Sequence, residues 1–296
     1  MKNIIYISLL FLFLFLPSCG PDLTSAQEVI KLQVLNIKSD KPELHPGDTV
    51  KSEVLIAKPE GNTEEYHTVW LLCDPKSDGA SGTSFATCMN PQNSNLIGAP
   101  SINTTEYSAK IPEDVLSKKN LESKYMYVLF VMCKADLETC TKSMSPDENT
   151  DMNSNPFSSG VFNLTLKRIR VVSKDTEITN NNPKIEGIYL NDKLIDSDSI
   201  KLSDDDVFKV KIDKSSYDKK TDPNGELIDE TIATAWKSNK GKFEFYLTNQ
   251  EKDEDLDDLD ENPFSTPDEI GDGYKLYIIA TDARGGADWR ILKVTP

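Results

Sequence analysis

The sequence predicts an all-β protein, built as two tandem immunoglobulin-like β-sandwich domains behind a lipoprotein signal peptide. Two observations predict the sandwiches. Apolar and polar residues alternate with a period of two over many short segments, and Pro, Gly, Asn and Asp separate these segments. Each half of the chain holds about seven such segments, with a tryptophan, Trp70 or Trp236, on the third. A tryptophan in that place fills the space between the two sheets of a sandwich.

Residues 1–18 are expected to be a cleaved signal peptide. Lys2 precedes the apolar run 4–16, which has the length of a signal-peptide core and is shorter than the roughly 20 residues that span a bilayer. The Leu-Pro-Ser-Cys that follows resembles the bacterial lipobox, although Pro17 departs from the residues usual at its position. The resemblance implies cleavage before Cys19 and acylation of this cysteine. Two or three acyl chains anchor a protein stably where one chain would not.

Residues 19–29 are then a lipidated cysteine and tether, and membrane contact is expected through this lipid anchor. Gly20 follows the cysteine where an Asp would retain the protein, which in enterobacterial-type sorting implies the outer membrane. The sequence thus predicts a cell-envelope protein, on either the extracellular or the periplasmic face. Its formal net charge of −16 argues against nucleic acid as a partner and against electrostatic docking onto anionic lipid.

The other four cysteines all lie in the first half of the chain. An even number in an exported protein favours two disulfides, and the absence of a CxxC spacing argues against a metal site. Each first cysteine ends an apolar strand-like run, and each second one lies in the polar loop that follows. The favoured pairs are therefore the local ones, Cys73–Cys88 and Cys133–Cys140. The main rival pairing joins Cys73 to Cys133 at two neighbouring strand ends.

The first sandwich is expected over residues 30–173. Its strands are predicted at 31–37, 50–56, 68–73, 124–133 and 162–167. In the second of these, the apolar residues share one face and the lysine and glutamate point away. Residues 74–100 and 136–159 are rich in turn-forming residues and are predicted to be long loops. Residues 113–121 could form a short helix.

Residues 174–184 are polar and are predicted to be a linker, and residues 185–296 the second sandwich. The clearest strands of this half are predicted at 208–212, 231–237, 242–247, 274–281 and 289–294. The Asp-Pro-Asn-Gly at 222–225 is a strong turn signal. Because this half holds no cysteine, its apolar core alone must stabilise it.

Two stretches carry a family resemblance. Residues 274–286 (YKLYIIATDARGG) look like the last hairpin of bacterial Ig-like and PKD-like domains, in which a Thr-Asp ends the strand before a Gly-containing turn. The whole layout resembles uncharacterised surface lipoproteins of myxobacterial type. They join a lipobox to a Pro-Gly turn (46–47), a Trp closely followed by a Cys (Trp70, Cys73) and a closing Asp-x-Arg-Gly-Gly-x-x-Trp (282–289). The resemblance implies a fold and an envelope location, and no activity.

The sequence carries no clear catalytic signature, so the protein is predicted not to be an enzyme. His45 sits in a turn and His67 precedes a strand, and no G-x-S-x-G occurs. We therefore expect a role in surface binding, adhesion or envelope architecture, with an unknown protein or glycan as ligand. The loops 74–100, 136–159 and 248–272 are the expected contact surfaces. The alternatives are a carbohydrate-binding accessory module and a calcium-stabilised adhesive module.

The calcium alternative rests on the acidic run 251–262, since carboxylate oxygens are the ligands that Ca²⁺ prefers. Positions 1, 3, 5 and 12 of an EF-hand-like spacing are filled by Asp258, Asp260, Asn262 and Glu269. Position 6, which needs a glycine, is Pro263, and strands rather than helices flank the loop. A solvated acidic loop is therefore the favoured interpretation, and no other cofactor is expected. The run 204–206 is a weaker case of the same kind.

Two further features could bind a ligand. The hairpin turn 282–286 could expose Arg284 as a recognition tip for a carboxylate. The favoured alternative is a structural turn, in which Gly285 and Gly286 supply positive φ and the preceding aspartate bonds to the backbone. Tyr277, predicted on an outward face, could stack on a sugar.

Overall fold

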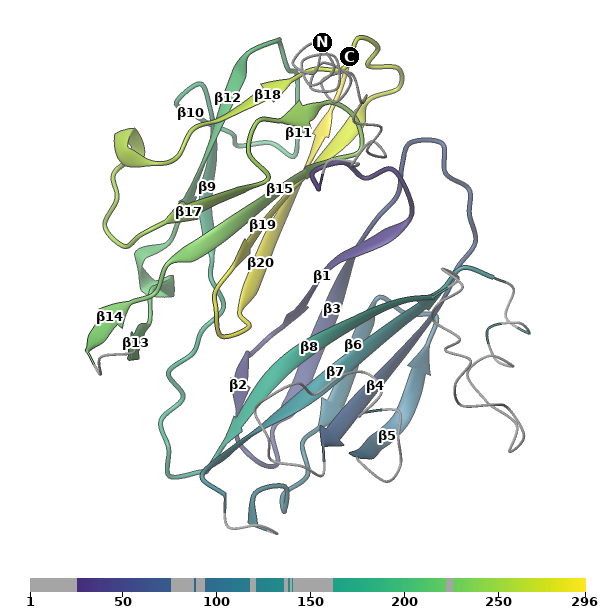
Figure 1. Cartoon of the computed structure of the whole chain (residues 1–296), viewed down its shortest axis with the longest axis vertical. Helices are drawn as coiled ribbons and strands as arrows, with labels where there is room; N and C mark the ends of the chain where they lie inside the picture. Colours follow the sequence, from purple (N-terminus) through teal and green to yellow (C-terminus); the bar gives the residue numbers. More distant parts are fainter. Residues whose placement is uncertain are drawn as a thin grey trace, which may run out of the picture.

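Strands dominate the computed structural model of the chain, which confirms the all-β prediction (Figure 1). The structure describes residues 26–75, 94–117, 121–135, 162–221 and 226–296, together with Cys88, Glu138 and Cys140. The signal peptide, Cys19 and most of the loops 74–100 and 136–159 lie outside the described residues. Within the described part, no helix is both long enough and apolar enough to cross a membrane.

The first half of the chain forms a β-sandwich of two sheets. Its strands are β1 (Gln33–Ser39), β2 (Glu43–Leu44), β3 (Thr49–Ala57), β4 (His67–Pro75), β5 (Ser94–Ile102), β6 (Glu106–Lys110), β7 (Ser123–Cys133) and β8 (Phe162–Val172). One sheet has the order β1-β3-β6 and the other the order β2-β8-β7-β4-β5. A hydrophobic core that draws residues from both sheets lies between them.

The second half forms two five-stranded sheets and a small ribbon. Its elements are β9 (Ile185–Leu190), β10 (Lys193–Leu194), β11 (Ser199–Ile200), β12 (Asp206–Ile212), η4 (Lys214–Ser216), β13 (Lys219–Thr221), β14 (Leu227–Asp229), β15 (Ile232–Ser238), β16 (Lys242–Phe243), β17 (Leu247–Gln250), η5 (Leu256–Asp258), β18 (Asn262–Ser265), β19 (Tyr274–Thr281) and β20 (Ala287–Val294). The sheets have the orders β10-β9-β12-β18-β16 and β11-β20-β19-β15-β17, and β13 pairs with β14. A separate hydrophobic core lies between the two large sheets.

Trp70 and Trp236 are fully buried between the sheets of their half, as the sequence predicts. The Trp70 ring stacks on Tyr107 at 5.7 Å and meets Phe130 edge-on, and its Nε1 donates to the Thr104 carbonyl at 2.8 Å. The Trp236 ring lies 5.1 Å from Phe243, and its Nε1 donates to the Thr248 hydroxyl. Each ring therefore buries a large apolar area while its one polar atom stays hydrogen-bonded.

Three local expectations are wrong. Residues 94–100, expected to be part of the loop 74–100, belong to the edge strand β5. Residues 113–116 make turns and not a helix. Short strands were also missed, so the halves hold more than seven strands and the tryptophans lie on β4 and β15.

The two disulfides have the predicted local pairing. Cys73 is joined to Cys88 with their Cα atoms 5.7 Å apart, and Cys133 is joined to Cys140 with their Cα atoms 5.9 Å apart. The rival Cys73–Cys133 pairing is wrong. Each disulfide belongs to a small apolar cluster separate from the sandwich core.

Residues 26–29, the described part of the expected tether 19–29, are docked onto the second half and are not free. Gln27 and Val29 are buried against the second half. The Ser238 N–H donates to the Gln27 carbonyl at 2.9 Å, and the Val29 N–H donates to the Ser238 carbonyl at 2.8 Å. The chain thus begins alongside the end of β15 and then crosses to the first half (Figure 1).

Candidate functional site at the junction of the two halves

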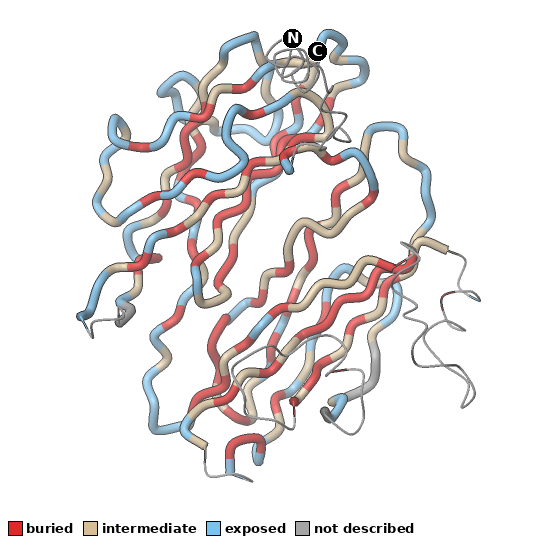
Figure 2. Tube along the Cα trace, viewed as in Figure 1, coloured by how far each residue is buried: buried red, intermediate tan, exposed pale blue. Residues whose placement is uncertain are grey.

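An apolar cluster joins the two halves. The first half contributes Val29, Leu55 and Ala57, and the second half contributes Tyr277 and Ile279. Figure 2 shows how buried residues run along the strands of both halves, including those that meet here. Tyr277 is therefore covered by the first half, and its predicted outward face is wrong. Burial raises the pKa of its phenol to about 12.

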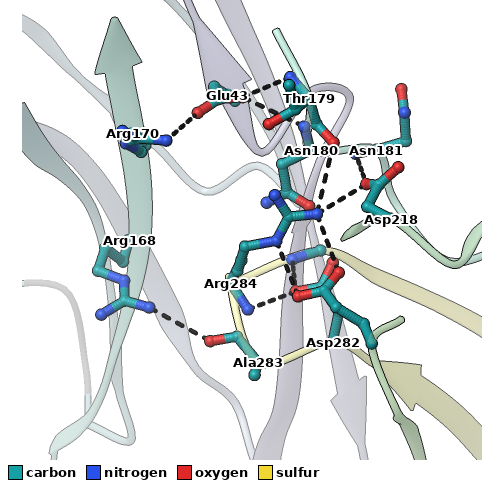
Figure 3. Close-up of polar contacts among 12 residues, drawn as sticks. Glu43, Arg168, Arg170, Thr179, Asn180, Asn181, Asp218, Asp282, Ala283 and Arg284 are labelled. Atoms are coloured by element: carbon teal, nitrogen blue, oxygen red, sulfur yellow. Dashed lines mark hydrogen bonds and ion pairs between the residues drawn. The ribbon is translucent and has the colours of Figure 1, made fainter. Parts of the chain in front are cut away.

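Residues 179–182, within the expected linker, form a polar strap that is bonded to the first half. The carboxylate of Glu43, only 1% exposed, accepts hydrogen bonds from the Thr179 N–H at 2.8 Å and the Asn180 N–H at 3.1 Å (Figure 3). Its other oxygen pairs with Arg170 Nη1 at 2.8 Å. A buried carboxylate that accepts from two backbone N–H groups and from an arginine holds the strap in place.

The same strap is bonded to the second half. The Asn182 side chain bonds to both halves: its Nδ2 donates to the Ser39 carbonyl of the first half at 2.7 Å, and its Oδ1 accepts from the Ala287 N–H of the second half at 3.1 Å. The Asn181 N–H donates to Asp218 Oδ2 at 2.9 Å. A segment whose composition predicts a flexible linker therefore serves as a fixed bridge between the halves.

Arg284 does not form an exposed recognition tip. Its Nε and Nη2 grip the Glu230 carboxylate at 2.8 and 2.9 Å, and Nη2 also lies 2.8 Å from Asp218 Oδ2 (Figure 3). Glu230 is only 1% exposed. Burial by itself would lower the pKa of Arg284, but the hydrogen bond and the charge of Glu230 raise it. Two nitrogens of the guanidinium are thus bonded to carboxylates of the protein, and the side chain is only 25% exposed.

The turn that carries Arg284 has the structural form that the sequence favoured. Asp282 Oδ1 accepts from the Arg284 N–H at 2.8 Å and from the Gly286 N–H at 2.7 Å. Gly285 has φ +106°, which favours glycine, whereas Gly286 is not among the described residues with positive φ. The prediction was therefore right for one glycine and wrong for the other.

A buried lysine faces this turn. Lys167 on β8 is buried, and this burial lowers its pKa to about 8, while the charge of Asp282 acts in the opposite direction. The second oxygen of Asp282, Oδ2, is buried and has no hydrogen-bond partner in the described structure. The two charges therefore compensate each other across the junction without forming a close ion pair.

The stability of the protein should rise between pH 8 and pH 10 because of Lys167. Its folded pKa of about 8 lies below the ordinary value of 10.5, so in this window the unfolded chain binds more protons. The rise should reach about 3 kcal/mol at most. Urea unfolding at several pH values would measure it. Lys167→Met should remove most of the rise and leave the contribution of Lys237, whose pKa burial also lowers. The tyrosines titrate in both proteins alike. Parallel profiles for the two proteins would refute this assignment.

A solvent-open cavity of about 410 Å³ lies at the other end of the junction. The connection between β3 and β4 rises beside the second half there, and Glu60 of this connection pairs with Lys240 (Figure 1). The cavity is lined by Ile56, Lys58, Pro59, Glu60, Asn62 and Tyr66 from the first half and by Asn239, Gly273, Tyr274, Lys275, Tyr277 and Lys293 from the second.

Three lysines line this cavity. Lys275 on β19 lies directly opposite Lys293 on β20, and no ion pair is recorded for either within the described residues. The ammonium group of Lys58 lies 4.8 Å from the centre of the Tyr66 ring. Like charges directly opposite each other on neighbouring strands destabilise a sheet. The cavity is thus a positive spot on a strongly negative protein.

The residues of the calcium prediction are not brought together. Asp258 lies in η5, the carboxylate of Asp260 accepts from the Asn249 N–H at 3.2 Å, and Glu269 is exposed. Asn262 is fully buried and uses its side chain on the backbone of Phe245. The described residues include no group of three or more His, Cys, Asp or Glu that could hold a metal ion.

The other residues singled out from the sequence have structural partners. His45 Nδ1 lies 3.3 Å from the Val172 carbonyl, and His67 Nδ1 lies 3.3 Å from Asn103 Oδ1. In the run 204–206, Asp206 accepts from the Asn191 side chain and from the Ser203 N–H. These contacts stabilise turns and the ends of strands.

Comparison with known proteins gives little further guidance. No protein-family model matches the chain, and no curated protein sequence matches it. Among solved structures, the adhesin InvE of Yersinia pseudotuberculosis is 8% identical, with 88% of this chain and 60% of that one covered and a TM-score of 0.23. The two tandem V-type regions of a chitin-binding protein are also 8% identical, with 89% and 100% covered and a TM-score of 0.27. Scores this low carry no argument about fold or function.

Proposed function

We propose that this chain is a non-enzymatic cell-envelope lipoprotein that acts by binding, with two tandem immunoglobulin-like sandwiches joined as one rigid body. The lipobox at Cys19 supports the anchor, and the paired sheets around Trp70 and Trp236 support the domain type. The polar strap and the apolar cluster support the rigid junction. A protein of this kind presents a fixed surface to a ligand.

The observation that carries the binding role is the lysine-lined cavity between the halves. The chain has 49 acidic residues. Even so, Lys275 and Lys293 lie opposite each other, and neither forms an ion pair with a carboxylate in the described part of the chain. Lysine side chains that no carboxylate neutralises create a positive potential in the cavity, and this potential attracts a negatively charged ligand. The ligand would also relieve the repulsion between the two lysines.

A small acidic saccharide is the ligand class that fits best. The lysine ammonium groups would bind a carboxylate, and the partly buried Tyr66, whose ring lies under Lys58, would add an apolar contact to a sugar ring. The cavity volume of about 410 Å³ lies within the usual range for ligand pockets, roughly 300–1,000 Å³. The ligand is thus a glycan, one of the two classes that the sequence allows, and it would bind in the cavity rather than at the loops that the sequence indicates.

Calorimetric titration would test the proposal with a uronic-acid disaccharide and its neutral counterpart. We expect binding of the acidic sugar only, weakened about tenfold or more in a K275Q/K293Q variant and weakened by added salt. A K51Q/K193Q variant is the matched control, because both lysines are exposed and lie outside the cavity lining. Equal binding of the two sugars, or equal affinity of the two variants, would contradict the proposal.

A further inference from the structure

Three consecutive apolar side chains are exposed on the connection from β16 to β17 and on the first residue of β17. Phe245 is 47% exposed, Tyr246 59% and Leu247 38%. Single exposed apolar residues are ordinary on protein surfaces, but a run of three large ones marks a contact site or an aggregation hazard. The lysine-lined cavity does not include this run.

The backbone of this run is held in place from inside the protein. The fully buried Asn262 accepts from the Phe245 N–H at 3.0 Å and donates to the Phe245 carbonyl at 2.9 Å. The Trp236 N–H donates to the Tyr246 carbonyl at 3.0 Å. The three side chains are therefore presented by a fixed loop and are not exposed through fraying.

The segment that leads from the lipid anchor is bonded to the same loop. Gln27 Nε2 donates to the carbonyl of Glu244, the residue before this run, at 3.3 Å. The neighbouring Ala26 carbonyl accepts from Lys237 Nζ of β15 at 2.5 Å. Only residues 20–25 separate Cys19 from Ala26, and this length of chain spans at most roughly 25 Å. An acylated Cys19 would thus hold the loop close to the bilayer surface.

We infer that Phe245, Tyr246 and Leu247 form a membrane-contact surface that enters the headgroup region beside the lipid anchor and fixes how the protein stands on the bilayer. The inference rests on the lipid anchor of the proposed function. Aromatic residues favour the membrane interface, and leucine enters its apolar side. Because the attraction is apolar, it needs no anionic lipid, which agrees with the net charge of −16.

The test places a fluorescent reporter in the contact surface of the full lipidated protein. A Y246W variant is reconstituted in phosphatidylcholine vesicles with brominated acyl chains, which quench tryptophan at short range. We expect its emission to shift to the blue and to lose at least half of its added intensity. An I102W variant is the matched control, since Ile102 is 56% exposed on the edge strand β5. Its added emission should stay unquenched.

Two further readouts separate the possible failures. Mass spectrometry of the same samples reports whether Cys19 carries lipid. Equal quenching at positions 246 and 102 in a lipidated protein overturns the membrane-contact surface and leaves the proposed anchor intact. An unlipidated Cys19 overturns both. A detergent-solubilised dimer that becomes monomeric in an F245S/Y246S/L247S variant assigns the surface to a second copy of the chain, and this also overturns the inference.

Discussion

Replacement of Arg284 by alanine should lower the free energy of unfolding by about 3–5 kcal/mol. The reason is the carboxylate of Glu230, which is 1% exposed and is gripped by two nitrogens of Arg284. Without the guanidinium, this charge stays buried and uncompensated. Asp218 and the Thr179 carbonyl lose a donor at the same time. Arg284→Lys should recover only part of the loss, because an ammonium group cannot reproduce the two parallel hydrogen bonds.

Urea unfolding followed by tryptophan fluorescence would measure this effect. Arg168→Ala is the matched control, because Arg168 is exposed and reaches the same turn through one 3.4 Å hydrogen bond to the Ala283 carbonyl. The control should change the unfolding free energy by less than about 1 kcal/mol. If the two variants lose the same free energy of unfolding, the contact between Arg284 and the buried Glu230 does not have the stabilising effect expected here.

Replacement of Glu43 by alanine should have the second largest effect, about 3 kcal/mol. The N–H groups of Thr179 and Asn180 would lose their acceptor, and Arg170 would lose its partner. The loss should be concentrated in the strap. We therefore expect amide hydrogen exchange at residues 179 and 180 to accelerate more than exchange in the core strands.

Glu53→Ala is the control for Glu43. Glu53 also pairs with a cation, Lys38 at 2.8 Å, but its side chain is 45% exposed, whereas that of Glu43 is 1% exposed. Surface ion pairs of this kind contribute roughly 0–1 kcal/mol. If Glu43→Ala leaves exchange in the strap unchanged, the strap is held by its asparagines alone and the central role of Glu43 is wrong.

The features that sequence predicts well here are the local ones. Period-two alternation, the buried tryptophans and the short-range disulfides each depend on residues close in the chain. The apolar part of the junction also has a sequence signal, although the strand pattern was interpreted without it. Leu55 and Ala57 in β3, and Tyr277 and Ile279 in β19, are apolar on faces that a free sandwich would expose. Apolar residues on both faces of a strand indicate a second covering layer.

The polar part of the junction could not be predicted in this way. Arg284, Glu230 and Asp218 meet from three separate segments, and an arginine in a turn has the same local pattern whether it faces water or a buried carboxylate. The strap resembles a flexible linker in composition, because asparagine serves loops and buried hydrogen bonds equally well. The role of Asn262 was missed for the same reason, since an acidic neighbourhood suggested a cation ligand.

If Cys19 carries lipid, as we propose, the docking of residues 26–29 onto β15 reverses the order of the two halves along the membrane normal. With lipid at Cys19, the half that comes later in the sequence stands next to the bilayer, and the earlier half, with both disulfides, projects away from it. The C-terminus follows β20 and therefore returns to the membrane-proximal half. A tag after Pro296 would report the base of the molecule, and antibody access to the disulfide-bearing half would report its outer end.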